Sequence, residues 1–123
     1  MLTVKTKIQQ SKIHGTGLFA DEFIPKGTLV WEFNPKFDLV WNNEEFNLLP
    51  EKAKNCIIFY GHFNWEEGGY ILCSDDARFF NHSQNPNCKS EVNKTYSISD
   101  INIGDEITDN YMEWDELFRL KNI

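Results

Sequence analysis

The apolar residues of this chain come in short runs that turn-forming residues interrupt, which limits the fold to small strands and short helices. The clearest run, residues 28–33 (TLVWEF), is rich in β-branched and aromatic residues and lies between Gly27 and Asn34. Similar runs predict strands at 3–8, 18–20, 37–41, 70–73, 92–98 and 106–108. We expect 37–41 to pair with 28–33 across the Asn34-Pro35 turn. Helices are predicted at 50–60, which Gly61 would end, and at 112–120.

The length and composition are those of one ordinary globular domain over residues 1–123. Aromatic residues make up 15% of the chain, which argues against intrinsic disorder. No apolar run reaches the length of about 18 residues that would span a bilayer, and the first ten residues contain no apolar signal segment. Three cysteines without such a segment suggest reduced thiols, so an intracellular location is expected.

The charge balance is acidic, with 12 Lys and Arg against 19 Asp and Glu, giving a net charge of −7. This balance disfavours direct nucleic-acid binding, which needs clustered basic side chains on the phosphates. It is compatible with a basic partner, such as a lysine-rich peptide, and equally with a role in solubility alone.

Three segments have the residue types of a functional site. The first is 14–20 (HGTGLFA), where Gly15 and Gly17 would let a ligand approach the main chain closely, or would simply form a tight turn. Its glycine spacing resembles a dinucleotide-binding fingerprint, but Pro25 and Gly27 leave no room for the helix that this fingerprint requires.

The second segment is 77–88 (ARFFNHSQNPNC), in which an aromatic pair runs directly into residues that form strong local hydrogen bonds. It fits neither a Ser-His hydrolase nor a zinc site, because it lacks a nucleophile elbow and paired metal-ligand spacing. The third segment is 104–111 (GDEITDNY). Its tyrosine alone indicates only packing, and the neighbouring acidic pairs elsewhere in the chain are typical of a solvated surface rather than of a hydrolase.

Together and in this order, the three segments resemble the SET domain, the fold of many protein-lysine methyltransferases. HGTGLFA is similar to the family's GxG-Leu-Phe segment, and ARFFNHSQNPNC resembles its Arg-Phe-x-Asn-His-Ser-x-x-Pro-Asn signature almost letter for letter. GDEITDNY resembles its Gly-x-Glu-Leu/Ile-Thr-x-Asp-Tyr segment. The resemblance covers about residues 5–112, and it implies a mostly β fold of several small sheets with a C-terminal pseudoknot, an exception to the usual unthreaded connections.

The resemblance also implies a cofactor, S-adenosylmethionine, and a set of residues that would bind it. The glycine segment and the Asn-His pair would border the cofactor, and Tyr111 matches the family's catalytic tyrosine. An aromatic residue of the C-terminal cover segment, about 112–123, would stack on the adenine. The expected cofactor-binding residues are His14, Gly15, Thr16, Gly17, Asn81, His82 and Trp114.

Several positions depart from the family pattern. Gln84 stands where many members have a zinc-binding cysteine, so no zinc is expected. Asn110 replaces the usual Asp before the tyrosine. Phe33, Ser90 and Asp109 occupy positions that are often tyrosine or another aromatic, and they would line the substrate channel. Residues from about 34 to 72 would form the variable insert that shapes the peptide groove.

The function implied by this resemblance is transfer of a methyl group to a lysine amine of a basic protein, with histone-like, ribosomal and other basic targets equally open. The alternative is a binding module that keeps the fold but transfers no methyl group, which the unusual channel residues suggest. No membrane partner is expected. The location would be cytoplasmic for a bacterial protein, and nuclear or host-cell for a eukaryotic or viral one.

Overall fold

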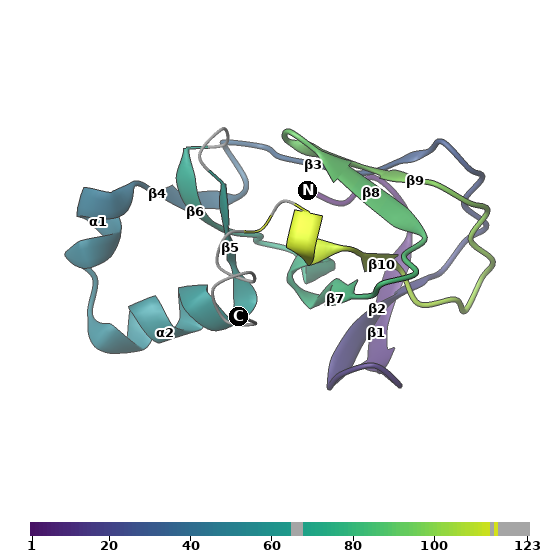
Figure 1. Ribbon diagram of the computed structural model, residues 1–123, viewed down its shortest axis with the longest axis horizontal. Helices are drawn as coiled ribbons and strands as arrows, with labels where there is room; N and C mark the ends of the chain where they lie inside the picture. Colours follow the sequence, from purple (N-terminus) through teal and green to yellow (C-terminus); the bar gives the residue numbers. More distant parts are fainter. Residues whose placement is uncertain (65–67, 114, 116–123) are drawn as a thin grey trace.

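The computed structural model describes residues 1–64, 68–113 and 115, and arranges them as four small sheets with a few short helices (Figure 1). β1 (Thr6–Gln10) and β2 (Thr16–Ala20) form a hairpin, and β3 (Leu29–Glu32), β9 (Lys94–Ser97) and β8 (Cys88–Glu91) form an antiparallel sheet in that order. A second antiparallel sheet has the order β4 (Leu39–Trp41), β6 (Gly69–Leu72), β5 (His62–Asn64). The predicted class, mostly β with short helices, is confirmed.

The helices are short and begin and end where the sequence signals lie. α1 (Asn43–Asn47) starts with a capping box, in which the Asn42 side chain and the Glu45 side chain each bind the other residue's backbone N–H. α2 (Glu51–Tyr60) is the predicted helix at 50–60, with Pro50 as its N-cap and Gly61 as its C-cap. Two 3-10 turns, η1 (Asp76–Phe79) and η2 (Tyr111–Glu113), complete the described elements.

The predicted pairing of 37–41 with 28–33 is wrong. β3 pairs with β9, whereas β4 pairs with β6. The cause is Asp38, which is only 4% exposed. Its carboxylate accepts hydrogen bonds from the backbone N–H groups of Asn34 (2.9 Å) and Ser74 (3.3 Å), so it ties this turn to the chain that follows β6 instead of closing a hairpin.

β4, α1, α2, β5 and β6 form a distinct group that we call the insert region (residues 39–64 and 68–72). Figure 1 shows it to the left of most other strands, with η2 between the two groups. Aromatic contacts hold it together, because the Tyr70 ring stacks on Phe46 at 3.8 Å between centroids and meets Phe63 edge-on at 4.8 Å. The insert region falls within the predicted variable insert at 34–72, whose boundaries stay a prediction.

The main core lies on the other side of the molecule. Its buried members come from β2, β3, β8 and the connecting segments, and they are Leu18, Ala20, Ile24, Val30, Cys88, Ile101 and Ile107. The backbones of Ile24 and Ile101 exchange two hydrogen bonds, of 2.9 and 2.8 Å, which fixes two distant segments side by side. Phe79 and Phe80 pack against this core, so the segment with the Asn-His pair rests on a rigid base.

The C-terminal stretch lies directly beside the Asn-His pair. β10 (Thr108–Asp109) pairs in parallel with β7 (Asn81–His82), and the Ser83 N–H donates to the Asp109 carbonyl at 2.9 Å. The predicted pseudoknot requires these two segments to lie side by side. The pseudoknot itself stays a prediction, and of the predicted helix at 112–120 only 112, 113 and 115 are among the described residues.

Candidate active site

A cavity of about 690 Å³ lies between the insert region and the rest of the molecule. Its wall includes residues of the glycine segment, of β7, β8 and β10, of η1 and η2, and of the end of α2. Pockets of this size bind small molecules and cofactors. All three segments that the sequence singled out therefore meet at one cavity.

The glycine segment forms one wall of the cavity, through His14, Gly15 and Thr16. Gly15 has a φ of +47°, the left-handed region that favours glycine. The side-chain amide of Asn81 holds this wall in place, since Nδ2 donates to the carbonyls of His14 (3.0 Å) and Thr16 (3.3 Å). The same Nδ2 also donates to Glu106 Oε2 at 2.9 Å.

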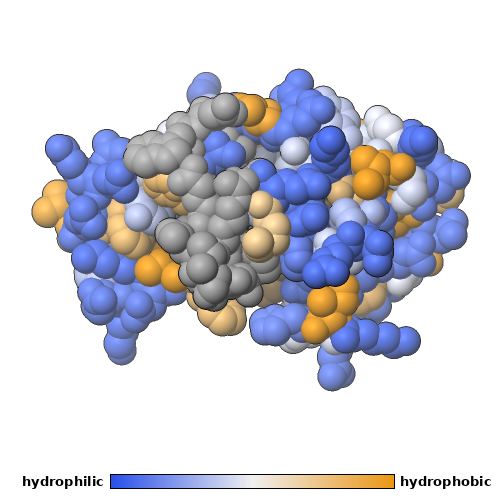
Figure 2. Space-filling view, viewed as in Figure 1, coloured by the Kyte–Doolittle hydropathy of each residue, from blue (hydrophilic) through white to orange (hydrophobic). Residues whose placement is uncertain are grey.

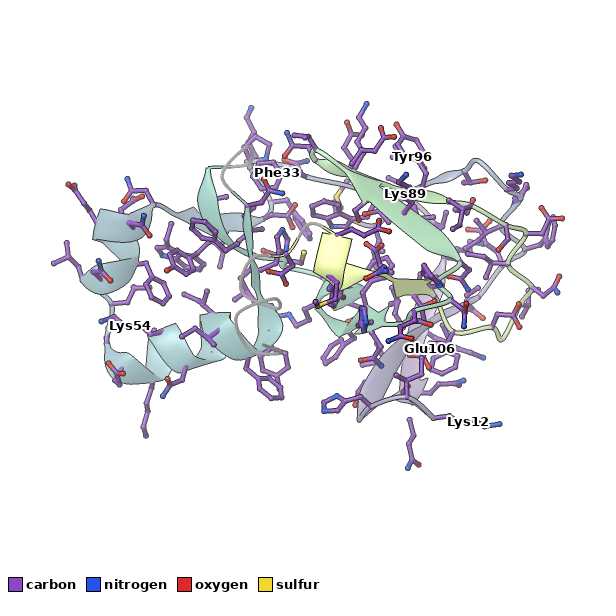
Figure 3. All side chains as sticks on the ribbon, in the orientation of Figure 1. Lys12, Phe33, Lys54, Lys89, Tyr96 and Glu106 are labelled. Carbon is purple, nitrogen blue, oxygen red and sulfur yellow. The ribbon has the colours of Figure 1, made fainter. Side chains whose placement is uncertain are left out.

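Gly17 is not among the residues that line the cavity, although the sequence placed it with the cofactor-binding set. A Cβ at this position would lie 2.5 Å from Glu106 Oε2 and 3.0 Å from the Ser11 Cβ. Figure 3 shows Glu106 beside β1 and β2. The second glycine therefore makes room for the carboxylate that binds Asn81 and Ser11.

Tyr111 and His82 meet on the neighbouring wall. The Tyr111 N–H donates to His82 Nδ1 at 3.1 Å, so this nitrogen carries no proton, and the Tyr111 hydroxyl donates to the Phe80 carbonyl. Burial first, and then the charges of Asp109, Cys73 and Asp115, raise the pKa of the Tyr111 phenol well above its ordinary value of 10. The phenol therefore stays protonated near neutral pH, as a fixed neutral group.

Two of the three predicted channel residues lie beside Tyr111. Asp109 and Ser90 both line the cavity, and Ser90 Oγ donates to Asp109 Oδ2 at 2.5 Å. Phe33 does not line it. Its side chain packs instead against the small cluster of Trp31, Cys73 and Ala77, and Figure 3 shows it near β3.

The cavity also contains aromatic residues that the sequence analysis did not select. Tyr60 ends α2 and meets the Phe79 ring edge-on at 6.1 Å, and both line the cavity. Arg78 lies over the Tyr60 ring at 5.9 Å, while its Nε and Nη2 donate to the Cys73 carbonyl. The sequence signal was present, since an aromatic pair ends the helix and another precedes the Asn-His pair. Only the tertiary fold brings the two pairs together.

Trp114, the predicted adenine-stacking residue, lies outside the described residues. Trp31 does line the cavity, and its buried indole N–H has no acceptor among the described residues. An orphaned buried donor in a cavity wall calls for a physical reason, and a bound ligand would provide one. Within the described part of the chain, no group of three or more His, Cys, Asp or Glu could hold a metal ion.

The surface and helices add two general observations. Figure 2 shows a face that is mostly hydrophilic, with apolar residues scattered rather than gathered. Among the described residues, no helix is long and apolar enough to cross a membrane.

Comparisons with solved structures agree with this fold. The chain is similar to a candidate histone methyltransferase of Plasmodium falciparum, at 23% identity and a TM-score of 0.63 over 89% of this chain and 95% of that one. It is also similar to Polycomb repressive complex 2 of Chaetomium thermophilum bound to S-adenosylmethionine (22% identity, TM-score 0.67, 97% of this chain). A humanized mutant of that complex bound to an inhibitor gives 21% identity and a TM-score of 0.67 over 94% of this chain.

The chain spans only 16% of the length of those Polycomb chains, and at these identities the likeness shows the fold alone. No curated protein matches the chain. The family description of the SET domain matches residues 15–112, which is well over half of the sequence and includes all of the cavity-lining motifs except His14. The chain belongs to the SET domain family.

Proposed function

We propose that this protein is an S-adenosylmethionine-dependent protein-lysine N-methyltransferase that acts on a basic protein. The observation that carries the proposal is that one cavity is lined both by the glycine wall, held by Asn81, and by Tyr111, whose phenol is neutral. Family membership supports the general class of methyltransferase. The net charge of −7 supports a basic substrate, because opposite charges raise the rate of encounter.

The residues present fit the cofactor. Gly15 leaves the main chain open, with no atom within 4 Å of where a Cβ would stand, and the Tyr60 and Phe79 rings offer flat apolar surfaces for an adenine. The buried carboxylates of Asp109 and Asp115 suit a cationic sulfonium. Asp115 also accepts the Phe63 N–H at 3.2 Å, which fixes it between β5 and the C-terminal segment. When bound, S-adenosylmethionine would supply an electrophilic methyl group.

The side chains of the protein would then hold and orient the lysine amine. Only about one lysine in a thousand is neutral at pH ~7.4, given an unperturbed pKa near 10.4, and only the neutral amine is a nucleophile. Tyr111 cannot take up the excess proton, because its own phenol stays protonated. Its oxygen, oriented by the hydrogen bond to the Phe80 carbonyl, is suited to accept a hydrogen bond from the amine and to align it.

The test is methyl transfer from labelled cofactor to lysine-rich proteins, with a host-cell lysate as the widest source and methyl-lysine identified by mass spectrometry. Label on a lysine is the expected result. Binding of S-adenosylmethionine in calorimetry without label on any protein would instead favour a non-catalytic binding module. Absence of binding as well would remove the methyltransferase proposal altogether.

A further inference from the structure

The wall of the cavity beside Tyr111 carries a buried carboxylate to which the proposed function gives no part in proton transfer. Asp109 is 2% exposed, and it lines the cavity together with Tyr111 and Asp115. Among the described residues that line the cavity, Arg78 is the one Lys or Arg, and its guanidinium binds the Cys73 carbonyl. The negative charge of the wall thus suits a ligand that brings its own positive charge.

A chain of hydroxyl groups holds the carboxylate in place. Ser90 and Thr95 are directly opposite each other on β8 and β9, and their hydroxyl oxygens are 2.8 Å apart. Ser90 has a single hydroxyl proton, which it donates to Asp109, so Thr95 donates to Ser90. The Asn110 N–H donates to the other carboxylate oxygen at 2.8 Å. Ser90 is half-buried, so the chain of hydroxyls connects the carboxylate to the edge of the cavity.

Two weaker acids close to Asp109, the Cys88 thiol and the Tyr111 phenol, keep their protons near neutral pH. Burial, and then the charge of Asp109, raises the pKa of Cys88 to about 12, and the pKa of Tyr111 is raised well above 10. A thiol or phenol in that state is no proton acceptor. A carboxylate, whose unperturbed pKa is about 3.9, is the ordinary acceptor among these side chains.

Building on the proposed function, we propose that Asp109 accepts the proton that the substrate's lysine ammonium must lose before methyl transfer. In this step a lysine N–H bond breaks and its electron pair stays on nitrogen, while an O–H bond forms on the Asp109 carboxylate. The neutral amine then displaces the thioether of S-adenosylmethionine. A new N–C bond replaces the S–C bond, whose electron pair goes to sulfur. Asp109 afterwards loses its proton to solvent, and the site returns to its initial charge.

Several titratable groups surround Asp109 and would contribute to any pH profile. They are His82 on β7, Cys88 and Glu91 on β8, Cys73 after β6, Tyr111 on η2, and Asp115. Asp109→Asn keeps all of them and changes one carboxylate to a neutral amide of the same shape. The ratio of the variant's rate to the wild-type rate therefore isolates the contribution of Asp109.

The test measures the ratio of the Asp109→Asn rate to the wild-type rate at about pH 7 and at about pH 10. We expect Asp109→Asn to be at least about tenfold slower at pH 7, and to approach the wild-type rate near pH 10, where solvent itself supplies neutral lysine. A loss of the same size at both pH values would contradict the proposal, because a merely structural role does not depend on the protonation of the substrate. Thermal unfolding of both proteins checks that the variant is folded.

A second variant tests the hydroxyl chain with the carboxylate kept. Ser90→Ala removes a hydrogen bond that favours the ionised form of Asp109, so the acid limb of the rate profile should move to higher pH. An acid limb that stays where it is would contradict the assignment of this limb to Asp109.

A binding measurement separates this inference from the proposed function. n-Butylammonium has the same charged end as lysine, and n-butanol is its neutral counterpart. By NMR titration, Asp109→Asn should weaken n-butylammonium binding at least about fivefold at pH 7 and leave n-butanol binding unchanged. Equal weakening of both probes would contradict an ammonium site at Asp109. Wild-type protein that binds n-butylammonium through Asp109, but transfers no methyl group, would overturn the proposed function alone.

Discussion

Asn81 joins three parts of the molecule through one amide group. Its Nδ2 binds two carbonyls of the glycine wall and the carboxylate of Glu106, which in turn accepts the Ser11 hydroxyl at 2.7 Å. Such a shared donor fixes positions rather than adding much free energy, because each net hydrogen bond is worth only about 1 kcal/mol. We therefore expect Asn81 to affect cofactor binding largely through the wall that it holds.

Asn81→Ala should weaken S-adenosylmethionine binding by roughly tenfold or more, since it frees the His14 and Thr16 carbonyls and leaves Glu106 with only the Ser11 hydroxyl as a side-chain donor. Isothermal titration calorimetry measures the effect. Asn85→Ala is the matched control, because Asn85 is exposed on the same segment. The affinity of this variant for S-adenosylmethionine should equal that of the wild type. Equal affinity of Asn81→Ala and Asn85→Ala would show that the wall does not depend on this amide.

At the scale of elements, local signals predicted which segments are regular but not all of their partners. The helix α2 has its proline and glycine at the expected ends, and β3 is the predicted run TLVWEF shortened at both ends. The pairing of β4 could not be predicted, because it depends on the buried Asp38 binding the backbone of Ser74, 36 residues later. The spacing of residues along the sequence does not indicate a hydrogen bond between two residues that are so far apart.

The raised pKa of Cys88 on β8, caused by burial and then by Asp109 of β10, predicts how the stability of the fold depends on pH. Cys88 has a pKa of about 12 when folded against an ordinary value of 9.0, and the Tyr111 pKa is raised as well. Above about pH 9 the unfolded chain loses the thiol proton while the folded protein keeps it, so the unfolded state binds fewer protons and stability falls as pH rises. The slope is about 1.4 kcal/mol per pH unit for each such group, and the effect is absent below pH 9.

Urea unfolding at about pH 8, 9.5 and 10.5 measures this fall. Cys88→Ala is less stable overall, because it leaves a small cavity in the core, but its stability should decline less steeply with pH. Cys56→Ala is the control, since Cys56 is exposed, and its slope should match that of the wild type. A slope that Cys88→Ala leaves unchanged would mean that this thiol does not titrate abnormally.

At the scale of the whole molecule, the cavity exists because the insert region and the remaining strands close on η2 from two sides. The residues that the sequence selected and that line this cavity are His14, Gly15, Thr16, Asn81, His82, Ser90, Asp109 and Tyr111. The sequence motifs could not predict the part of the wall that comes from α2 and β5, because no motif marks the residues of the insert. Gly17 and Phe33 lie in or beside the motifs but do not line the cavity. Gly17 makes room for Glu106, and Phe33 packs against Trp31.

The insert region should therefore contribute to cofactor binding. Tyr60→Ala removes the ring that faces Phe79 and Arg78, and we expect S-adenosylmethionine affinity to fall by about 0.5–1.5 kcal/mol, the range of an aromatic contact. Leu48→Ala is the control within the same region, because Leu48 is 85% exposed and remote from the cavity lining. Unchanged affinity in Tyr60→Ala would limit the cofactor to the other side of the cavity.

The central claim is that Tyr111 aligns a lysine amine in this cavity, and Tyr111→Phe tests it most directly. The variant loses only the hydroxyl that binds the Phe80 carbonyl. With a substrate found by the lysate screen, the account predicts that the rate of methyl transfer falls at least about tenfold, while S-adenosylmethionine affinity and thermal stability stay close to wild type. Methyl transfer by Tyr111→Phe at the wild-type rate would contradict it.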